Sequence, residues 1–228
     1  MKILSSALSV FAITTIAAGA VAAAPIMVTP AGLAPGEQFR VVFVTDRVTN
    51  ATSTDLSTYD SFVTTDANGA TYHGTTIAWK AIISNSTTNA RDHIGLLSDS
   101  TIPVFRVDGT QVSTGNLWSS SLIAPINKGI SGNIIEVSVW AGTNEDGSRK
   151  YGATLGDGGV SLGHTLFTTG RWIDNLFTSG IPFLHNYWMY GISEILTVPA
   201  AVPEPSTMML VGLGGLSALA YSFKRKRN

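Results

Sequence analysis

Few residues in this sequence have the type and spacing that catalysis or metal binding requires. The four histidines, His73, His93, His164 and His185, stand singly along the chain. Zinc ligands usually come in pairs close in sequence, and the chain has no cysteine to supply a thiolate or a disulfide, so we expect no metal and no cofactor. The abundant serines give no assignable nucleophile. We therefore expect that the protein is not an enzyme, and a hydrolase is the weaker alternative.

Residues suited to sugar recognition gather in a glycine-rich segment from about Thr143 to Trp172. Its glycines cannot supply a core, so we expect the segment on the surface. Amide, carboxylate and guanidinium groups pair with hydroxyls, and an aromatic ring stacks on a sugar. The candidate ligand face consists of Asn144, Asp146, Arg149, Arg171 and Trp172, with Tyr151 as an alternative stacking ring. For Trp172 itself core packing is the favoured interpretation, and a loop without a ligand is the alternative for the whole segment.

The same segment begins with Asn144-Glu145-Asp146-Gly147, which places an amide and two carboxylates in a turn. The spaced acidic pattern of a calcium loop is missing. We therefore favour a hairpin turn in which Asp146-Gly147 supplies the special backbone angles.

The charge of the chain argues against nucleic acid as a partner. The formal net charge is −1, but Lys2 and residues 224–227 account for five of the 14 basic residues. Nine basic residues then face 14 acidic ones once Glu204 is set aside, which leaves the middle of the chain at about −5. Phosphate binding needs a concentrated basic face, and this composition provides none.

The first 23 residues resemble a signal peptide. Lys2 precedes an apolar run from Ile3 to about Ala18, and small residues around Val21-Ala22-Ala23 suit a cleavage site. The pattern predicts Sec-dependent export and removal by signal peptidase. A permanent N-terminal membrane helix is the alternative.

The last residues combine a motif, an apolar stretch and a basic cluster. The motif is Val202-Pro203-Glu204-Pro205, and the stretch runs from Met208 to Phe223. Its length barely suffices to span a bilayer, and the positive charges after it hold that end in the cytoplasm. We expect a C-terminal transmembrane helix that acts as a stop-transfer anchor, with the charged residues Lys224, Arg225, Lys226 and Arg227 behind it.

These three parts, in this order, resemble the PEP-CTERM sorting signal of Gram-negative bacteria that make extracellular polysaccharide. The resemblance covers about 26 residues and implies processing by an exosortase, a membrane transpeptidase-like enzyme. It also implies that the protein is anchored in the inner membrane before processing. Afterwards it would belong to the cell surface or the extracellular matrix.

The middle of the chain reads as one α+β domain over residues 38–199, after a lead-in at 24–37 and before a sorting region at 200–228. Strands are predicted at Gln38–Thr45, Ile77–Ser84, Pro103–Val107, Ile134–Trp140 and Trp188–Val198. Apolar spacing after Ser53 or Thr54, either of which is a suitable cap, predicts a helix that ends at Asn68-Gly69. Trp79 and Trp140 are expected in the core.

The order and spacing of several segments resemble the endostatin branch of the C-type lectin-like fold. The segments are Trp79–Ser84 with Asn89–Asp92, Ile102–Phe105, Leu117-Trp118 and Val139–Arg149. The resemblance implies short antiparallel strands, one or two helices, long loops, and a last strand paired with the first. Two departures matter. The family usually has disulfides, and the triplets that bind sugar through calcium are missing here.

Export, sorting and the polar loop together predict a non-catalytic module that binds polysaccharide or another surface component. The alternative is a structural envelope protein without a ligand.

Overall fold

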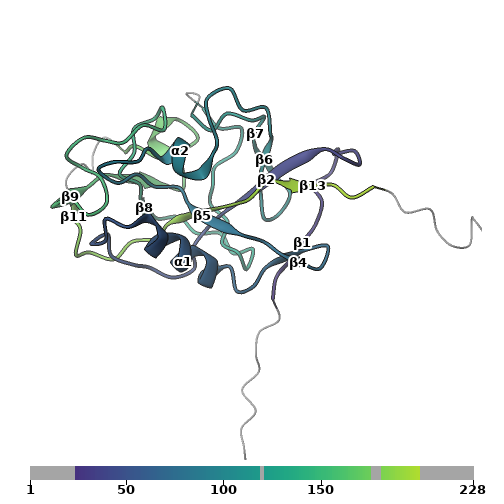
Figure 1. Ribbon diagram of the computed structural model, residues 1–228, viewed down its shortest axis with the longest axis horizontal. Helices are drawn as coiled ribbons and strands as arrows, with labels where there is room; N and C mark the ends of the chain where they lie inside the picture. The colour runs from purple at the N-terminus through teal and green to yellow at the C-terminus, as the bar shows by residue number, and fades with distance from the viewer. Residues whose placement is uncertain (1–23, 119–120, 176–180, 201–228) are drawn as a thin grey trace, which may run out of the picture.

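A six-stranded sheet built around β2 (Gln38–Val44) forms the centre of the molecule (Figure 1). The computed structural model describes residues 24–118, 121–175 and 181–200. The other strands of this sheet are β5 (Trp79–Ala81), β6 (Val104–Arg106), β7 (Gln111–Ser113), β12 (Tyr190–Ser193) and β13 (Leu196–Thr197). The order is β5-β12-β2-β6-β7, and β13 also pairs with β2. β2 is antiparallel to β12 and β13 and parallel to β6.

Short strand pairs and helices surround this sheet. The helices are α1 (Leu56–Asp66), α2 (Ala90–Ile94) and the 3-10 turn η1 (Gly170–Trp172). The remaining strands are β1 (Ile26–Met27), β3 (Thr71–Tyr72), β4 (Thr75–Thr76), β8 (Ser138–Trp140), β9 (Gly159–Val160), β10 (Leu162–His164) and β11 (Ile181–Pro182). They form a β1-β3-β4 sheet and the pairs β8–β10 and β9–β11. The described part is mostly sheet with few helices, in agreement with the predicted α+β class.

The strand β2 is buried on both faces and divides two apolar clusters. Side chains alternate along a strand, so Phe39, Val41 and Phe43 face one cluster while Val42 and Val44 face the other. The first cluster packs under α1 and the second under α2. Burial on both sides explains why the sequence here is almost continuously apolar. Arg40 is the exception, and it lies in β2 at a buried position.

The predicted pairing of the first long strand with the closing segment is confirmed. Ile192 lies opposite Val42, and Leu196 lies opposite Phe39. The closing segment therefore has one residue more than β2 over this stretch, which makes a β-bulge at Ser193–Ile195. At the bulge the backbone N–H of Val41 donates to the Ser193 hydroxyl at 2.9 Å, in place of a backbone carbonyl.

The predicted helix after Ser53 is present, but its cap is Asp55. The Asp55 carboxylate accepts a hydrogen bond from the Ser57 backbone N–H at 2.9 Å, which satisfies one of the unpaired donors of the first turn. Ser53 instead donates and accepts within the preceding loop. The helix ends at Asp66, and Asn68 and Gly69 follow it with positive φ, as predicted.

Two predicted strands are shorter than expected because the chain changes partners. Residues 77–84 form a strand only at β5, the Ile82 backbone N–H still donates to the Tyr190 carbonyl of β12, and the Ser84 backbone N–H donates instead to the Ala141 carbonyl. The predicted strand from Ile134 forms only at β8, and Ile134 itself is exposed.

The glycine-rich segment 143–172 is not confined to the surface, and that expectation is wrong. It contains β9, β10 and η1, and Leu155, Val160 and Leu162 join the cluster under α1. Glycines lower the number of apolar side chains in the segment, but the few that remain are placed inward.

Within residues 24–118, 121–175 and 181–200, no helix has the length and apolar character needed to cross a bilayer. The predicted signal peptide, the Val202–Pro205 motif, the apolar stretch and the basic cluster lie outside the described residues.

Candidate functional site

The turn that opens the glycine-rich segment is a hairpin, as the sequence predicted. Thr143 bridges Arg149, and the Asn144 backbone N–H donates to the Ser148 carbonyl at 2.8 Å. Gly147 has φ of +79°, a left-handed conformation that favours glycine. We call residues 143–149 the hairpin.

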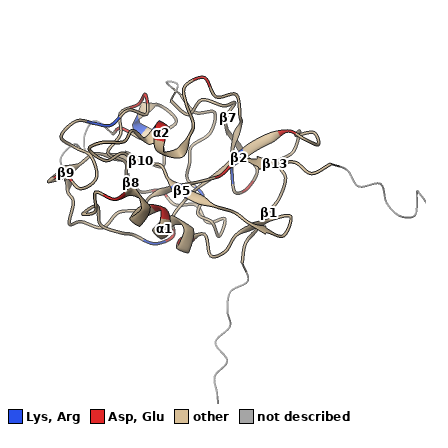
Figure 2. Cartoon of the chain, in the orientation of Figure 1, with Lys and Arg blue, Asp and Glu red and all other residues tan. Residues whose placement is uncertain are grey.

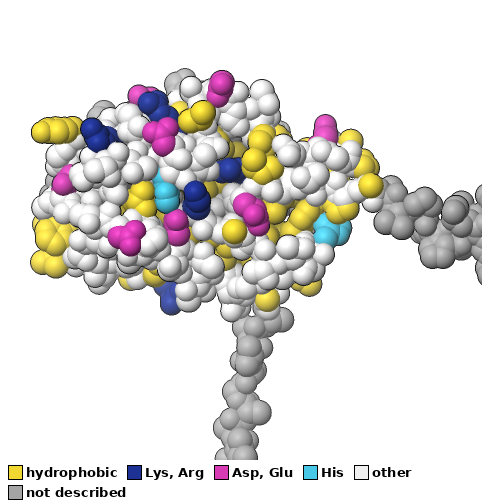
Figure 3. Space-filling model, viewed as in Figure 1, with side chains coloured by type: hydrophobic (Ala, Val, Ile, Leu, Met, Phe, Trp, Pro, Cys, Tyr) yellow, Lys and Arg dark blue, Asp and Glu magenta, His cyan; other side chains and the backbone are white. Residues whose placement is uncertain are grey.

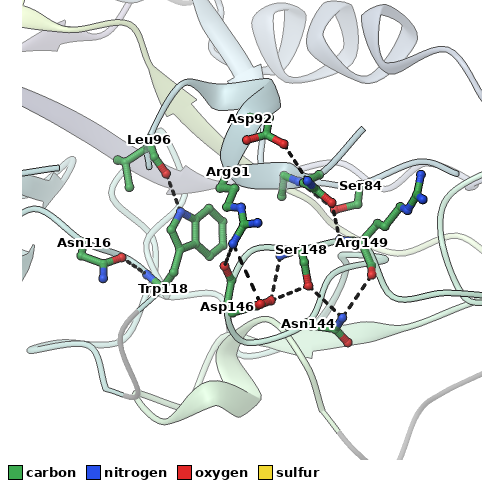
Figure 4. Close-up of polar contacts among 12 residues, drawn as sticks. Ser84, Arg91, Asp92, Leu96, Asn116, Trp118, Asn144, Asp146, Ser148 and Arg149 are labelled. Carbon is green, nitrogen blue, oxygen red and sulfur yellow. Dashed lines mark hydrogen bonds and ion pairs between the residues drawn. The ribbon is translucent and has the colours of Figure 1, made fainter. Parts of the chain in front are cut away.

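Polar side chains of the hairpin bind one another (Figure 4). Asp146 accepts from the Ser148 backbone N–H at 2.9 Å and from the Ser148 hydroxyl at 2.5 Å. The Ser148 hydroxyl bond is the main reason that the pKa of Asp146 lies below its usual value, and Arg91, 3.9 Å away, adds to the effect. The Asn144 amide donates to the Ser148 hydroxyl and to the Arg149 carbonyl.

Further bonds attach the hairpin to the loop before α2. The Arg149 guanidinium donates to the Ser86 carbonyl, and the Arg149 backbone N–H donates to the Asn89 side chain at 3.0 Å. Arg91 donates to the Asp146 carbonyl at 3.3 Å. Arg91 of α2 thus holds the hairpin in place. Figure 4 shows the contact between Arg91 and Asp146.

Trp172, the proposed stacking residue, is buried. It is 1% exposed and lies between Trp118, stacked at 5.9 Å, and Tyr190 at 5.6 Å. Gly147 of the hairpin packs against Trp118, since a Cβ at Gly147 would lie 2.6 Å from a carbon of the Trp118 ring. Trp172 therefore belongs to the core, and it is removed from the candidate ligand face.

Arg171 lies beside the hairpin and faces a different neighbour. Its guanidinium is 5.2 Å from the centre of the Phe167 ring. η1 approaches the hairpin closely, because the Glu145 carboxylate fills the space that a side chain at Gly170 would occupy. The structure therefore brings Asn144, Asp146 and Arg149 together, with Arg171 on the flank.

An exposed aromatic ring stands next to the hairpin. Tyr151 is 96% exposed and borders a small hollow of about 70 Å³ with Arg149 and Asp157. One oxygen of Asp157 accepts from the Thr154 backbone N–H and hydroxyl. We call Arg149, Tyr151 and Asp157 the Tyr151 surface, and it keeps the chemistry predicted for the candidate face with Tyr151 as the ring.

A second polar region was missed by sequence reasoning. A pocket of about 500 Å³ opens between α1, α2 and the bulged end of the central sheet, and we call it the Arg40 pocket. Its charged members are Arg40, Asp60, Lys80 and Glu194, and its apolar wall includes Ile94 and Ile195. A charged residue inside the apolar run of β2 was the available signal.

The acidic and basic groups of the pocket come from separate elements. Figure 2 shows acidic positions in red on α1, and Figure 3 shows basic, acidic and histidine side chains gathered near the middle of this face. Asp60 of α1 lies 2.9 Å from the His93 ring of α2 and accepts from the Ala81 backbone. Lys80 donates to the His93 carbonyl at 2.7 Å. These bonds join the two helices to β5.

The serine of a Gly-x-Ser-x-Gly pattern at residues 159–163 lies in the interior. A nucleophile elbow exposes its serine at a turn between a strand and a helix. Here Ser161 is fully buried between β9 and β10, and its hydroxyl makes no hydrogen bond with the residues that the structure describes. Residues 159–163 therefore match the hydrolase motif in sequence but not in geometry.

The described histidines and carboxylates form no group of three or more that could hold a metal ion. His164 is partly buried, and burial lowers its pKa while Glu136 acts in the opposite direction.

Comparison with known proteins identifies one segment. No curated protein matches the chain. Residues 201–226 match the family described as the PEP-CTERM protein-sorting motif, at the position that the resemblance indicated. The chain therefore carries a PEP-CTERM sorting signal, which implies export, a membrane-anchored signal before processing, and an exosortase as the processing partner.

Proposed function

We propose that this chain is an exosortase-processed protein of the cell surface or extracellular matrix, whose domain is a non-catalytic module that binds polysaccharide or another surface component. The sorting signal supports the cellular setting. The Tyr151 surface supports the binding role.

The observation that carries the binding role is the exposure of Tyr151 beside two charged groups. A ring that is 96% exposed offers a face to the apolar side of a sugar, while Arg149 donates and Asp157 accepts at its edge. The hairpin bonds hold Arg149 in place before any ligand arrives, so little ordering cost remains at that residue.

We propose that the fold is a C-type lectin-like domain of the endostatin branch without disulfides or calcium. Three observations support this: the first and last long strands pair, two short helices flank the sheet, and Trp118 and Trp140 are buried at the segments on which the resemblance rests. In such a domain the loops rather than the strands carry recognition.

Binding is tested with the full-length chain, purified in detergent and titrated with the extracellular polysaccharide of its own source organism. We expect Tyr151→Ala to weaken binding about three- to tenfold, since stacking contributes roughly 1 kcal/mol. The matched control is Leu184→Ala, which removes a residue that is 71% exposed and does not border the hollow. No binding by the wild type, or equal binding by both variants, would contradict the proposed surface and favour the structural envelope role.

Sorting is tested separately in cells by intact-mass analysis of the inner-membrane fraction. We expect Glu204→Ala to accumulate with its C-terminal tail, while the wild type loses the tail. Glu136→Ala, a change at an exposed glutamate of the domain, is the control and should be processed normally. A wild type that keeps its tail and fractionates like Glu204→Ala would refute exosortase processing.

A further inference from the structure

Arg40 is a nearly buried cation, and its side chain makes one hydrogen bond among the described residues. It is 7% exposed, and one terminal nitrogen donates to the Ile94 carbonyl at 2.7 Å. A guanidinium has five N–H donors, so most of them have no partner in the described protein. No carboxylate of the described residues lies within ion-pair distance of it. Burial lowers the pKa of Arg40 from its usual value, because desolvation penalises the charged form.

A neighbouring arginine shows what a structural arginine looks like in this sheet. Arg106 lies in β6, the strand next to β2, and pairs with Asp108 at 2.8 Å. It also donates to Thr110 and to Asn127. The hydrogen-bond donors of Arg106 are therefore paired within the protein, whereas Arg40 has donors on the wall of a pocket that pair with no described residue.

The bulge explains why the pocket lies beside Arg40. The extra residue at Ser193–Ile195 displaces the closing segment from regular pairing at Val41, where a serine hydroxyl replaces the backbone acceptor. Glu194 and Ile195 then border the pocket instead of continuing the sheet. Bulges often occur next to functional sites, where they redirect side chains.

The acidic groups of the pocket restrict the chemistry of any anionic ligand. Asp60 uses its Oδ1 atom for His93 and Ala81, and Glu194 uses Oε1 for the Ala78 N–H at 3.1 Å. The second oxygen of each carboxylate makes no hydrogen bond among the described residues. A bare anion would meet two negative charges here, so the ligand must also carry hydrogen-bond donors.

We propose that the Arg40 pocket binds a hydroxylated carboxylate of the size of a sugar acid. The ligand carboxylate lies on Arg40 and Lys80, and its hydroxyls donate to Asp60 and Glu194. A pocket of about 500 Å³ has the size of a small-molecule site. Several separated acceptors suit a polyhydroxylated ring better than the two charged ends of a free amino acid. This site is distinct from the Tyr151 surface, and the inference does not depend on that surface.

The probe is D-glucuronate, added to the full-length chain in detergent and followed by calorimetric titration and by melting temperature. We expect glucuronate to bind and to raise the melting temperature, while glucose, acetate and glycine at the same concentration do not. An oligouronate in a further titration distinguishes a free sugar acid from a residue of an acidic polysaccharide. Binding of either form supports the inference. Equal binding of glucose or acetate, or tighter binding of glycine, would overturn the ligand class.

Two variants test the cationic residues of the pocket, and Lys80→Met is included because a change at an exposed position keeps the fold. Arg40→Met removes the guanidinium and should weaken glucuronate binding by at least about thirtyfold. Lys80→Met changes an exposed side chain and should weaken it about three- to tenfold. Lys128→Met, whose ammonium also donates to a backbone carbonyl but lies outside the pocket, should bind like the wild type. Tyr151→Ala should also bind glucuronate normally. Wild-type affinity in Lys80→Met, or no glucuronate binding by the wild type, would refute the site.

Discussion

The hairpin and the Arg40 pocket are both rich in charged residues, but they use them in opposite ways. In the hairpin, the side chains of Asp146 and Asn144 bond to Ser148, and Arg149 bonds to the loop before α2. In the pocket, Arg40 has donors, and Asp60 and Glu194 each have one oxygen, that make no hydrogen bond with any described residue. Asp146 and Asn144 are satisfied within the hairpin and stabilise it, whereas the unsatisfied groups at the pocket wall are available to a ligand.

The largest expected effect is at Gly147, where the hairpin meets the core. Gly147→Ala would force an alanine into φ of +79° and place its Cβ 2.6 Å from Trp118. We expect the free energy of unfolding to fall by about 3 kcal/mol, from backbone strain and overpacking together. Urea denaturation measures the change.

The control for Gly147 is Gly109→Ala, at φ of +80° with nothing within 4 Å of the added Cβ. Gly109→Ala should lower the free energy of unfolding by only about 1 kcal/mol, because it introduces the backbone strain without the clash. Equal losses in the two variants would show that the hairpin does not rest firmly on Trp118.

A smaller effect is expected at Asp146, and it depends on pH. Asp146→Asn should lower the free energy of unfolding by roughly 0.5–1 kcal/mol at pH 7, a modest value because the side chain is largely exposed. The pKa of Asp146 is lowered in the folded protein, so its stabilisation is complete above the unfolded value of about 4. It is lost as the pH falls through the lower folded value.

The difference between wild type and Asp146→Asn should therefore disappear in denaturation curves collected at decreasing pH below about 4. Asp99→Asn, at an exposed aspartate without a hydrogen bond among the described residues, should match the wild type throughout. If the difference in the free energy of unfolding between wild type and Asp146→Asn persisted at acidic pH, the Ser148 bonds would not depend on the charge of the carboxylate.

The smallest expected effect on stability is at Arg40. Replacing a buried, unpaired charge by an apolar side chain of similar length is often neutral or stabilising, so Arg40→Met should change the free energy of unfolding by less than about 1 kcal/mol. A loss of about 3 kcal/mol or more would show that Arg40 supports the fold, as Arg106 does, and would remove the contrast between the two regions.

The sequence predicted elements that depend on local pattern. The pairing of β2 with the closing segment was implied by the resemblance to the C-type lectin-like fold. The apolar run of β2, the helix after Ser53 and the turn at Asp146-Gly147 follow from side-chain type and spacing. These features are decided by neighbours along the chain or by continuous burial, and both leave a periodic signal.

Core packing was the favoured interpretation of Trp172, but the distant partners that decide such features were not predicted. Trp172 is buried because Trp118 and Tyr190, far away in sequence, enclose it. The Arg40 pocket needs a bulge in the closing segment and two helices from the first half of the chain. Spacing within one segment contains no information about such assemblies, although a lone arginine in a buried strand could have marked the place.

The position of the bulge has a mechanical consequence. The chain passes from β12 through the bulge to β13, a strand of two residues, and then continues toward the sorting signal at 201–226. Tension applied through a C-terminal attachment would first reach the backbone hydrogen bonds of Val198 to Gly36 and Glu37, and then the short pairing of β13 with β2. The wall formed by Glu194 and Ile195 is next along the chain. A pulling force from the attachment point would therefore open the Arg40 pocket before it disturbed the rest of the domain.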